Sequence, residues 1–202
     1  MSTRPLSLRV LGVMPGVTPD AGAERSILTL APALLQAGIE LHLALLTDRQ
    51  TLVPQLEDLG VVIHDLSEAR RLPGRVRALQ DTVEGVAPAL VHATLFEASQ
   101  VAQLASVTAF RPKRVPLLVT WASTVYAAGA SHGVRWGGLK YGTLRWWEVT
   151  LARVSRARYH AVTQGVADYN SRRLRVDVER IRVGERGRDG QALRAEAERG
   201  GS

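Results

Sequence analysis

The stretch that decides the fold is RVLGVMPGVTPDAGAERSILTLAPALLQAG, residues 9–38. It starts inside an apolar strand predicted over residues 6–13, passes through a loop of small residues and prolines, and enters a helix near Gly22. Apolar residues recur at helical spacing along that helix, and Gly38 is a natural end for it. A strand that feeds a helix in this way directs the unpaired N–H groups of the helix out of the sheet. The stretch therefore predicts the opening βα unit of an α/β domain.

The loop before this helix has two interpretations. Gly22 and Ala23 carry little bulk, so an anion such as a diphosphate could approach the backbone at the helix N-terminus. Alternatively, the glycines serve the turn alone. The loop contains no GxxxxGK[ST], and Gly16 and Gly22 are too far apart for GxGxxG, which excludes the two usual phosphate motifs.

Composition sets the broad class of the protein. The chain has 202 residues and no cysteine, which excludes disulfides, thiolate metal sites and a cysteine nucleophile. Its first ten residues are too polar for a signal peptide, and no apolar run approaches membrane-spanning length. We therefore expect a cytoplasmic domain without thiolate metal sites.

The net charge of +7 comes from arginine, because only two of the 26 basic residues, Lys113 and Lys140, are lysines. This charge fits either a generally basic surface or an anionic partner such as a membrane surface or a nucleotide. No nucleic-acid recognition module is present, so we expect no nucleic-acid partner.

Strand and helix patterns alternate along the rest of the chain. Strands are predicted at 39–46, 61–64, 89–92, 116–120, 157–163 and 180–183, and helices at 51–59, 72–86, 96–109, 139–155 and 165–174. This alternation predicts an α/β fold, a Rossmann-like doubly wound parallel sheet. We interpret Asp48 as a cap for the helix at 51–59. The domain is predicted to span 1–184, and the charged, glycine-rich residues 185–202 to be a linker or disordered tail.

The predicted helix at 139–155 is amphipathic. Leu144, Trp147, Leu151 and Val154 share one face, Arg145, Arg153 and Arg156 lie roughly opposite, and Trp136, Tyr141 and Trp146 gather near its start. Two interpretations fit this pattern. The helix packs on the sheet with a solvated arginine face, or it presents aromatic and basic side chains to anionic lipid or a lipid-linked substrate.

Four stretches, in this order, resemble the N-terminal half of a GT-B glycosyltransferase of family 4. They are GAERSILTLAPALLQAGIELHLALLTD (22–48), PALVHATLFEASQVAQLA (88–105), RYHAVTQGVADY (158–169) and VERIRVGERGRD (178–189). Members of that family commonly show a GGAER-like loop after the first strand and a VHAH-like end of the fourth strand. The resemblance covers nearly the whole chain.

The resemblance implies a function. In the family, the N-terminal domain binds the acceptor, a C-terminal domain binds the nucleotide-sugar, and transfer retains the anomeric configuration, typically without a metal. It places Gly22 and Ala23 beside the donor diphosphate of a UDP- or GDP-sugar. His92 matches the first histidine of the VHAH-like motif and is a candidate catalytic residue, although a histidine at a strand end is often structural.

Three departures from the family pattern stand out. Ala21 replaces the first glycine of the usual pair, and Thr94 replaces the second histidine. Ala122 stands where a T-x-H motif places a histidine. This departure implies either a different acceptor chemistry or a subgroup in which Trp121, Ser123 and Thr124 line the acceptor pocket. The donor-site pair of glutamates is missing, and we interpret the C-terminal donor domain as absent.

These observations favour the acceptor-side domain of a retaining glycosyltransferase with a carbohydrate or lipid-linked acceptor, inactive without its second domain or a partner chain. The alternative is a non-catalytic partner subunit that associates with a second glycosyltransferase half or peripherally with the inner face of the membrane. The hypothesis of a nicotinamide-dependent oxidoreductase rests only on Asp48 after the second predicted strand. The missing GxGxxG motif argues against it.

Overall fold

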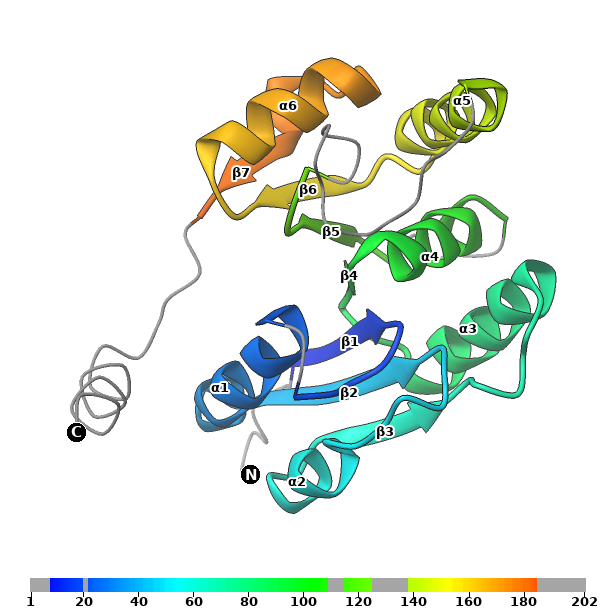
Figure 1. The fold of residues 1–202 in the computed structure, drawn as a ribbon. Helices are drawn as coiled ribbons and strands as arrows, with labels where there is room; N and C mark the ends of the chain where they lie inside the picture. The colour runs from blue at the N-terminus through cyan, green and yellow to red at the C-terminus, as the bar shows by residue number, and fades with distance from the viewer. Residues whose placement is uncertain (1–7, 20–21, 109–114, 125–137, 185–202) are drawn as a thin grey trace, which may run out of the picture.

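The computed structural model describes residues 8–19, 22–108, 115–124 and 138–184, with the side chains of 23, 24 and 138–141 also outside the description. Trp136, the side chain of Tyr141 and the predicted tail 185–202 therefore lie outside the described residues. Within that part of the chain, one parallel sheet is layered between helices (Figure 1).

The strands and helices alternate as the sequence pattern predicts. The strands are β1 (Leu8–Met14), β2 (Ile39–Leu45), β3 (Val62–Asp65), β4 (Leu90–Thr94), β5 (Leu117–Trp121), β6 (Arg158–Ala161) and β7 (Ile181–Val183). The helices are α1 (Gly22–Gln36), α2 (Val53–Asp58), α3 (Leu72–Val86), α4 (Phe96–Thr108), α5 (Gly138–Val154) and α6 (Gln164–Leu174), with a 3-10 turn at Val178–Arg180.

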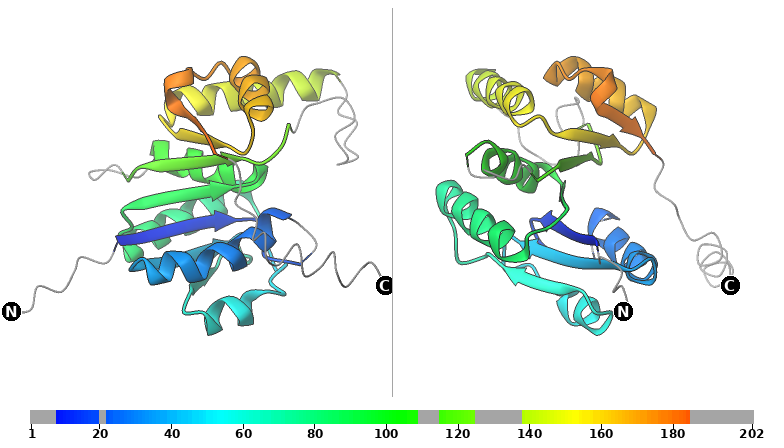
Figure 2. Two further views of the ribbon diagram at one scale, coloured as in Figure 1. Left: turned by 90° about the vertical axis from the view of Figure 1, so that its left-hand side faces the viewer. Right: turned by 180° about the vertical axis from the view of Figure 1, so that it is seen from behind.

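The strand order is β3-β2-β1-β4-β5-β6-β7, and every neighbouring pair is parallel. The direction of winding reverses between β1 and β4, which is the topological switch point of a doubly wound sheet. Right-handed crossovers then place α1 and α2 on one face and α3 to α6 on the other (Figures 1 and 2). The predicted Rossmann-like fold is confirmed.

Two apolar clusters form the core, one on each face. On the α1 side, Leu41, Leu43 and Leu45 of β2 pack with Ala31 of α1 and Leu56 of α2. The other cluster joins β1, β4, β5 and β6 to the apolar faces of α3 to α6. In the described residues no helix runs over β4 to β7 on the α1 side (Figure 1). These strands are therefore covered less on that face than on the face that carries α3 to α6.

The interpretation of Asp48 as a helix cap is wrong. Helix α2 begins at Val53 with Leu52 as its N-cap residue, and no side chain caps it. The segment before α2 is held by backbone bonds to the loop after β1, from Val17 N to Arg49 O and from Leu52 N to Val17 O. These bonds, and Pro54 in the first turn, define the helix start without a side-chain cap.

The predicted faces of α5 need a correction. Leu151 is buried as expected, but Val154 is 51% exposed and Ala152 takes its place in the core. Arg145 lies against α6, where its Nε donates to the carbonyl oxygen of Arg173. The buried face is rotated because α5 packs between α4 and α6 rather than flat on the sheet.

Candidate functional site

A pocket of about 300 Å³ opens at the carboxyl ends of the strands. It includes Pro15, which follows β1, and Leu95, which follows β4, so it reaches the switch point of the sheet. Open α/β sheets bind their ligands in the crevice outside the carboxyl ends at this point. The topology alone therefore marks this pocket as the candidate site.

Helices α4, α5 and α6 supply most of the pocket wall. The described lining residues are Pro15, Leu95, Phe96, Glu97, Ser99, Gln100, Gln103, Val119, Thr120, Trp121, Ala122, Ser123, Glu148, Ala152, Asn170 and Leu174. Most of this surface is apolar, with a few polar groups among it. That combination is typical of a small-molecule site.

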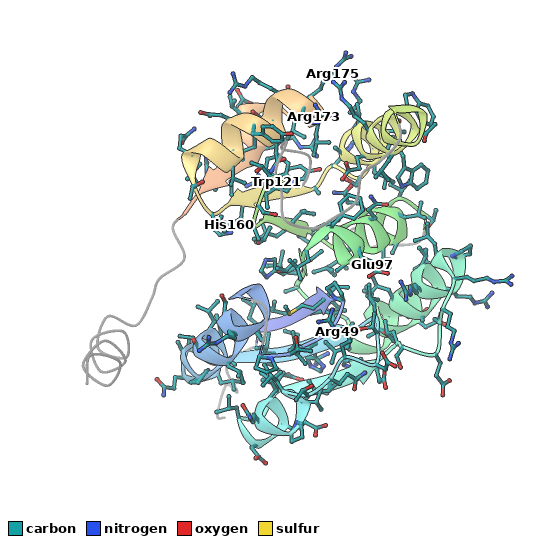
Figure 3. All side chains as sticks on the ribbon, in the orientation of Figure 1. Arg49, Glu97, Trp121, His160, Arg173 and Arg175 are labelled. Carbon is teal, nitrogen blue, oxygen red and sulfur yellow. The ribbon has the colours of Figure 1, made fainter. Side chains whose placement is uncertain are left out.

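Trp121 forms an aromatic wall that its neighbours hold in place (Figure 3). Its ring stacks on Tyr159, with ring centroids 4.4 Å apart, and the Arg180 guanidinium lies 5.5 Å from the centre of the Tyr159 ring. Arg180 is itself held by donating to the carbonyl oxygens of Ala152 and Ala157. Burial raises the pKa of Tyr159 to about 12, so its ring stays neutral within the stack. A supported aromatic ring suits stacking by the apolar face of a sugar or another ring.

Three amide side chains add polarity to the wall. Gln103 is buried and its Nε2 donates weakly to the Tyr159 hydroxyl at 3.4 Å. Asn170 is buried and donates from Nδ2 to the carbonyl oxygen of Ser123 at 3.3 Å, which ties α6 to the loop after β5. The Nε2 atom of Gln100 is buried without a hydrogen-bond partner in the described part of the chain. Amides can donate to and accept from hydroxyl groups, so this wall suits a hydroxylated ligand.

Two carboxylates lie in the pocket wall. The charged residues among the described lining residues are Glu97 and Glu148. Glu97 (Figure 3) forms an ion pair with Arg75 of α3, which also donates to the carbonyl oxygen of Ala69. The negative charge of Glu97 is therefore balanced within the protein.

The junction between β4 and α4 is strained. Leu95 has φ of 74°, in the left-handed region that a bulky side chain rarely adopts. Helix α4 begins at the next residue, so the backbone turns sharply between strand and helix. Strain of this kind persists where the surroundings hold the residue, commonly at ligand sites.

Beside the pocket, a hydrogen-bonded group of side chains crosses β4, β5 and β6. His92 Nε2 lies 2.7 Å from Thr120 Oγ1, and Thr120 Oγ1 lies 3.4 Å from His160 Nδ1. Thr120 is buried and also lines the pocket. His92 is not a lining residue, but its Nε2 bonds to Thr120, which is one.

The two glycines of the first loop have opposite surroundings. A Cβ on Gly16 would lie 2.5 Å from the backbone oxygen of Arg49, so this residue is packed tightly against the loop after β2. A Cβ on Gly22 would meet nothing within 4 Å among the described residues. Gly22 is exposed at the first residue of α1, and its carbonyl oxygen accepts from the Ser26 hydroxyl.

The structure brings some of the predicted site residues together. Trp121 and Ser123 line the pocket, whereas Thr124 does not. Gly22 stands apart at the start of α1, and the Ala23 side chain lies outside the description. The sequence pattern did not indicate the wall residues of α4 to α6 or the partnership of Thr120 with His92 and His160.

A second histidine pair lies at the other end of the sheet. His42 Nδ1 of β2 is 3.0 Å from His64 Nε2 of β3, and His42 Nε2 is 3.0 Å from Glu40 Oε1. Burial, and then the neighbouring His42, lower the pKa of His64. Among the residues that the structure describes, no three His, Cys, Asp or Glu side chains gather as metal ligands.

Comparison with known proteins decides the family. The model of Glycosyltransferase Family 4 matches residues 21–191. The chain belongs to Glycosyltransferase Family 4. The predicted resemblance to the N-terminal half of a GT-B glycosyltransferase is confirmed. A search of curated protein sequences found no match.

Solved structures show the same fold at low sequence identity. A glycosyltransferase from Rickettsia africae aligns with a TM-score of 0.64 and 16% identity, covering 96% of this chain and 49% of that one. UDP-GlcNAc 2-epimerase from Neisseria meningitidis, bound to UDP-GlcNAc, aligns with a TM-score of 0.57 and 16% identity, covering 95% of this chain and 50% of that one. MurG from Acinetobacter baumannii aligns with a TM-score of 0.56 and 13% identity, covering 92% of this chain and 47% of that one. This family 4 chain therefore spans about half the length of each structure.

No helix in the described residues is both long and apolar enough to cross a membrane.

Proposed function

We propose that this family 4 chain is the acceptor-side domain of a retaining, nucleotide-sugar-dependent glycosyltransferase that transfers a hexose without a metal. The observation that carries the proposal is the pocket at the switch point of the sheet, with Trp121 as its aromatic wall. A ligand seated there lies at the edge of the sheet from which the loop to Gly22 also leaves.

The acceptor occupies this pocket in our proposal. Trp121 contacts the apolar face of a carbohydrate or lipid-linked acceptor, and Ser123 of the following loop binds its hydroxyl groups. His92, which is linked to the pocket through Thr120, is the candidate catalytic residue.

The donor is a UDP- or GDP-sugar whose diphosphate lies at Gly22 and Ala23. Two observations support this part of the proposal. Space is open at Gly22, and α1 begins there, so the backbone N–H groups of its first turn and its dipole favour an anion. The similar epimerase from N. meningitidis is bound to UDP-GlcNAc.

Both substrates must be held together for transfer to occur. Proximity and orientation supply a large part of the rate enhancement in two-substrate reactions, about 7–11 kcal/mol in favourable cases. We therefore propose that residues 1–184 act as one domain, followed by a linker at 185–202, and that turnover is negligible until a donor-binding domain is supplied. That domain comes from the same polypeptide or from a partner chain.

The acceptor site is tested by calorimetric titration of the chain with neutral glycosides. We expect Trp121→Ala to weaken binding by about tenfold or more, the effect of losing an aromatic stacking contact of about 1.4 kcal/mol. Trp146→Ala is the matched control, because Trp146 is 69% exposed on α5 and does not line the pocket. Equal weakening by both substitutions, or by neither, would contradict the proposed pocket.

The donor site and the reaction need separate measurements. Titration with UDP-, GDP- and ADP-linked sugars identifies the nucleotide, and Gly22→Leu is expected to weaken that binding by filling the open space at the helix start. Transfer is then measured after a donor-binding half is added in trans or fused in cis. Inversion at the anomeric carbon of the product would contradict a retaining mechanism.

A second candidate function rests on the exposed Trp146 of α5 and on exposed basic residues of α5 and α6. Arg153, Arg172 and Arg175 are exposed, and arginine together with tryptophan suits a membrane interface. In this alternative the chain is a non-catalytic subunit at the inner face of the cytoplasmic membrane. Sedimentation with anionic vesicles at low salt tests it, and we expect Trp146→Ala to reduce binding while Trp121→Ala does not.

A further inference from the structure

Most polar side chains of the pocket wall already have a partner inside the protein. These side chains are Glu97, Ser99, Gln103, Thr120, Glu148 and Asn170. Ser123 has no need of one, because it is exposed to solvent. Gln100 differs from all of them, since its Nε2 atom is buried and has no hydrogen-bond partner in the described part of the chain. Gln100 therefore holds a buried donor that the protein itself leaves unused.

The position of Gln100 places this donor in the wall of the pocket. Phe96, four residues earlier, and Gln103, three residues later, also line the pocket, so all three share one side of α4. A buried N–H group without a partner costs free energy, and native structures normally avoid that cost. In a residue that lines a pocket, a bound ligand can supply the missing partner.

The Gln100 amide can turn toward a ligand without loss of a protein hydrogen bond. The last torsion of a glutamine side chain is broad, so rotation of the amide costs little. Because Nε2 has no partner to give up, the rotation breaks no bond of this atom. The same movement in Gln103 or Asn170 would break a bond that ties the wall together. Gln100 is thus the wall amide that a ligand recruits at the lowest cost.

The rest of the pocket indicates what kind of ligand carries the accepting atom. Most of its surface is apolar, with Leu95, Phe96, Val119 and Trp121 among the residues that form it. A buried hexose would need a partner for each of several hydroxyl groups, whereas an apolar ring with one accepting oxygen needs a single donor. The volume of about 300 Å³ is at the lower end for small-molecule sites, which suits one substituted ring.

We propose that the pocket binds the aglycone of the acceptor, the apolar group bonded to the acceptor sugar, and that Gln100 determines specificity by donating from Nε2 to an oxygen atom of this group. The aglycone is an uncharged ring that carries a carbonyl or ether oxygen and packs against Trp121. This inference rests on the proposed function, because the acceptor is assigned to the pocket there. It narrows the acceptor from any carbohydrate to one that carries an apolar group.

Calorimetric titration of the full chain with three β-glucosides tests the class of ligand. The methyl, 4-isopropylphenyl and 4-acetylphenyl glucosides share one sugar, and the two aryl groups differ mainly by a carbonyl oxygen. We expect both aryl glucosides to bind at least about tenfold more tightly than the methyl glucoside, because an aromatic ring enters an apolar pocket. Equal affinity for all three, or no binding of either aryl glucoside, would overturn the inference.

Substitution of Gln100 tests the hydrogen bond. Gln100→Met should weaken binding of the 4-acetylphenyl glucoside by about tenfold, the factor for one lost hydrogen bond, and leave binding of the 4-isopropylphenyl glucoside unchanged. Gln80→Met is the control, because Gln80 lies on α3 and does not line the pocket, and it should affect neither ligand. Equal weakening of the two aryl glucosides by Gln100→Met, or no weakening, would overturn the role of Gln100.

Urea denaturation without ligand separates this role from a structural one. Methionine is close to glutamine in size and has no donor, so Gln100→Met should shift the unfolding midpoint to higher urea. Gln103→Met should shift it to lower urea, because that variant loses the bond to the Tyr159 hydroxyl. A lower midpoint for Gln100→Met would show that Nε2 has a partner in the free protein and would overturn the inference.

Failure of this inference and failure of the proposed function give different results. Binding of the methyl glucoside as tight as that of the aryl glucosides, and weakened by Trp121→Ala, would retain the acceptor pocket and overturn the aglycone alone. The expected pattern with Gln100→Met, but no sugar transfer to the aryl glucosides after a donor-binding half is supplied, would confirm the aglycone site and place the failure in the proposed function.

Discussion

The two ends of the sheet each hold a histidine pair, and the pairs are built differently. At the β2–β3 end, His42 and His64 contact each other directly, with Glu40 on the other nitrogen of His42. At the β4–β6 end, the hydroxyl of Thr120 stands between His92 and His160. The first pair is far from the pocket, whereas the second shares Thr120 with it.

This difference suggests that the first histidine pair contributes to packing, whereas the second orients side chains beside the pocket. Two imidazole nitrogens in direct contact share one hydrogen, which one ring donates and the other accepts. A hydroxyl bridge both donates and accepts, so each neutral imidazole keeps a defined partner. We therefore expect substitutions at the β1–β3 end to reduce stability, and substitutions around the pocket to change ligand binding with a smaller loss of stability.

The largest effect is expected from Gly16→Ala in the packed loop after β1. The added methyl group would meet backbone at 2.5 Å, so the loop must move, at a cost of about 2–3 kcal/mol in the free energy of unfolding. Gly22→Ala at the start of α1 is the control, because no described atom lies within 4 Å of the added methyl group, and the expected change is within about 0.5 kcal/mol. Urea denaturation measures both, and equal losses would show that the two glycines are equally constrained.

Substitution in the His42–His64 pair should reduce stability more than substitution at His160. His42 is 7% exposed and bonded at both nitrogens, so we expect His42→Ala to cost about 2 kcal/mol. His160 is half-buried, and we expect His160→Ala to cost about 1 kcal/mol. Chemical denaturation of the two variants gives the order. A larger loss for His160→Ala would contradict the proposed division between the two ends.

Two non-glycine residues with positive φ, one at a helix end and one in the pocket wall, test whether relief of strain affects stability and ligand binding separately. Ala87 ends α3 with φ of 49°, and Ala87→Gly should stabilise the fold by about 0.5–1 kcal/mol because glycine adopts this conformation without strain. Leu95→Gly relieves similar strain but removes a side chain from the pocket wall. We expect little net change in its melting temperature together with weaker binding of neutral glycosides.

The smallest effect is a pH dependence from His64. Its folded-state pKa is lowered from the ordinary value of 6.5, so the unfolded chain binds more protons between the two pKa values. This contribution to stability is complete above pH 6.5 and is lost as pH falls through the folded-state pKa. Denaturation at several pH values should show the loss, and His64→Gln should reduce it. If the free energy of unfolding of that variant falls with pH as steeply as before, the pH dependence comes from other groups.

Local sequence patterns predicted the elements of this protein well. Apolar spacing placed α3 at Leu72–Val86 and the other helices and strands within a few residues, because each element must bury one face in the core. The ordered motifs predicted the family correctly. Trp121 and Ser123, which the resemblance assigns to the acceptor pocket, lie in the pocket wall, and their role there stays a prediction.

Tertiary structure decided what local patterns could not. Asp48 does not cap α2, since backbone bonds to the loop after β1 hold that segment. The direction in which α5 faces depends on packing between α4 and α6, and Val154 is exposed for that reason. Asn170 of α6 and Thr120 of β5 reach the candidate site from positions far apart in the chain. Their meeting depends on strand order and crossover handedness, which act on the whole sheet and leave no local signal at either residue.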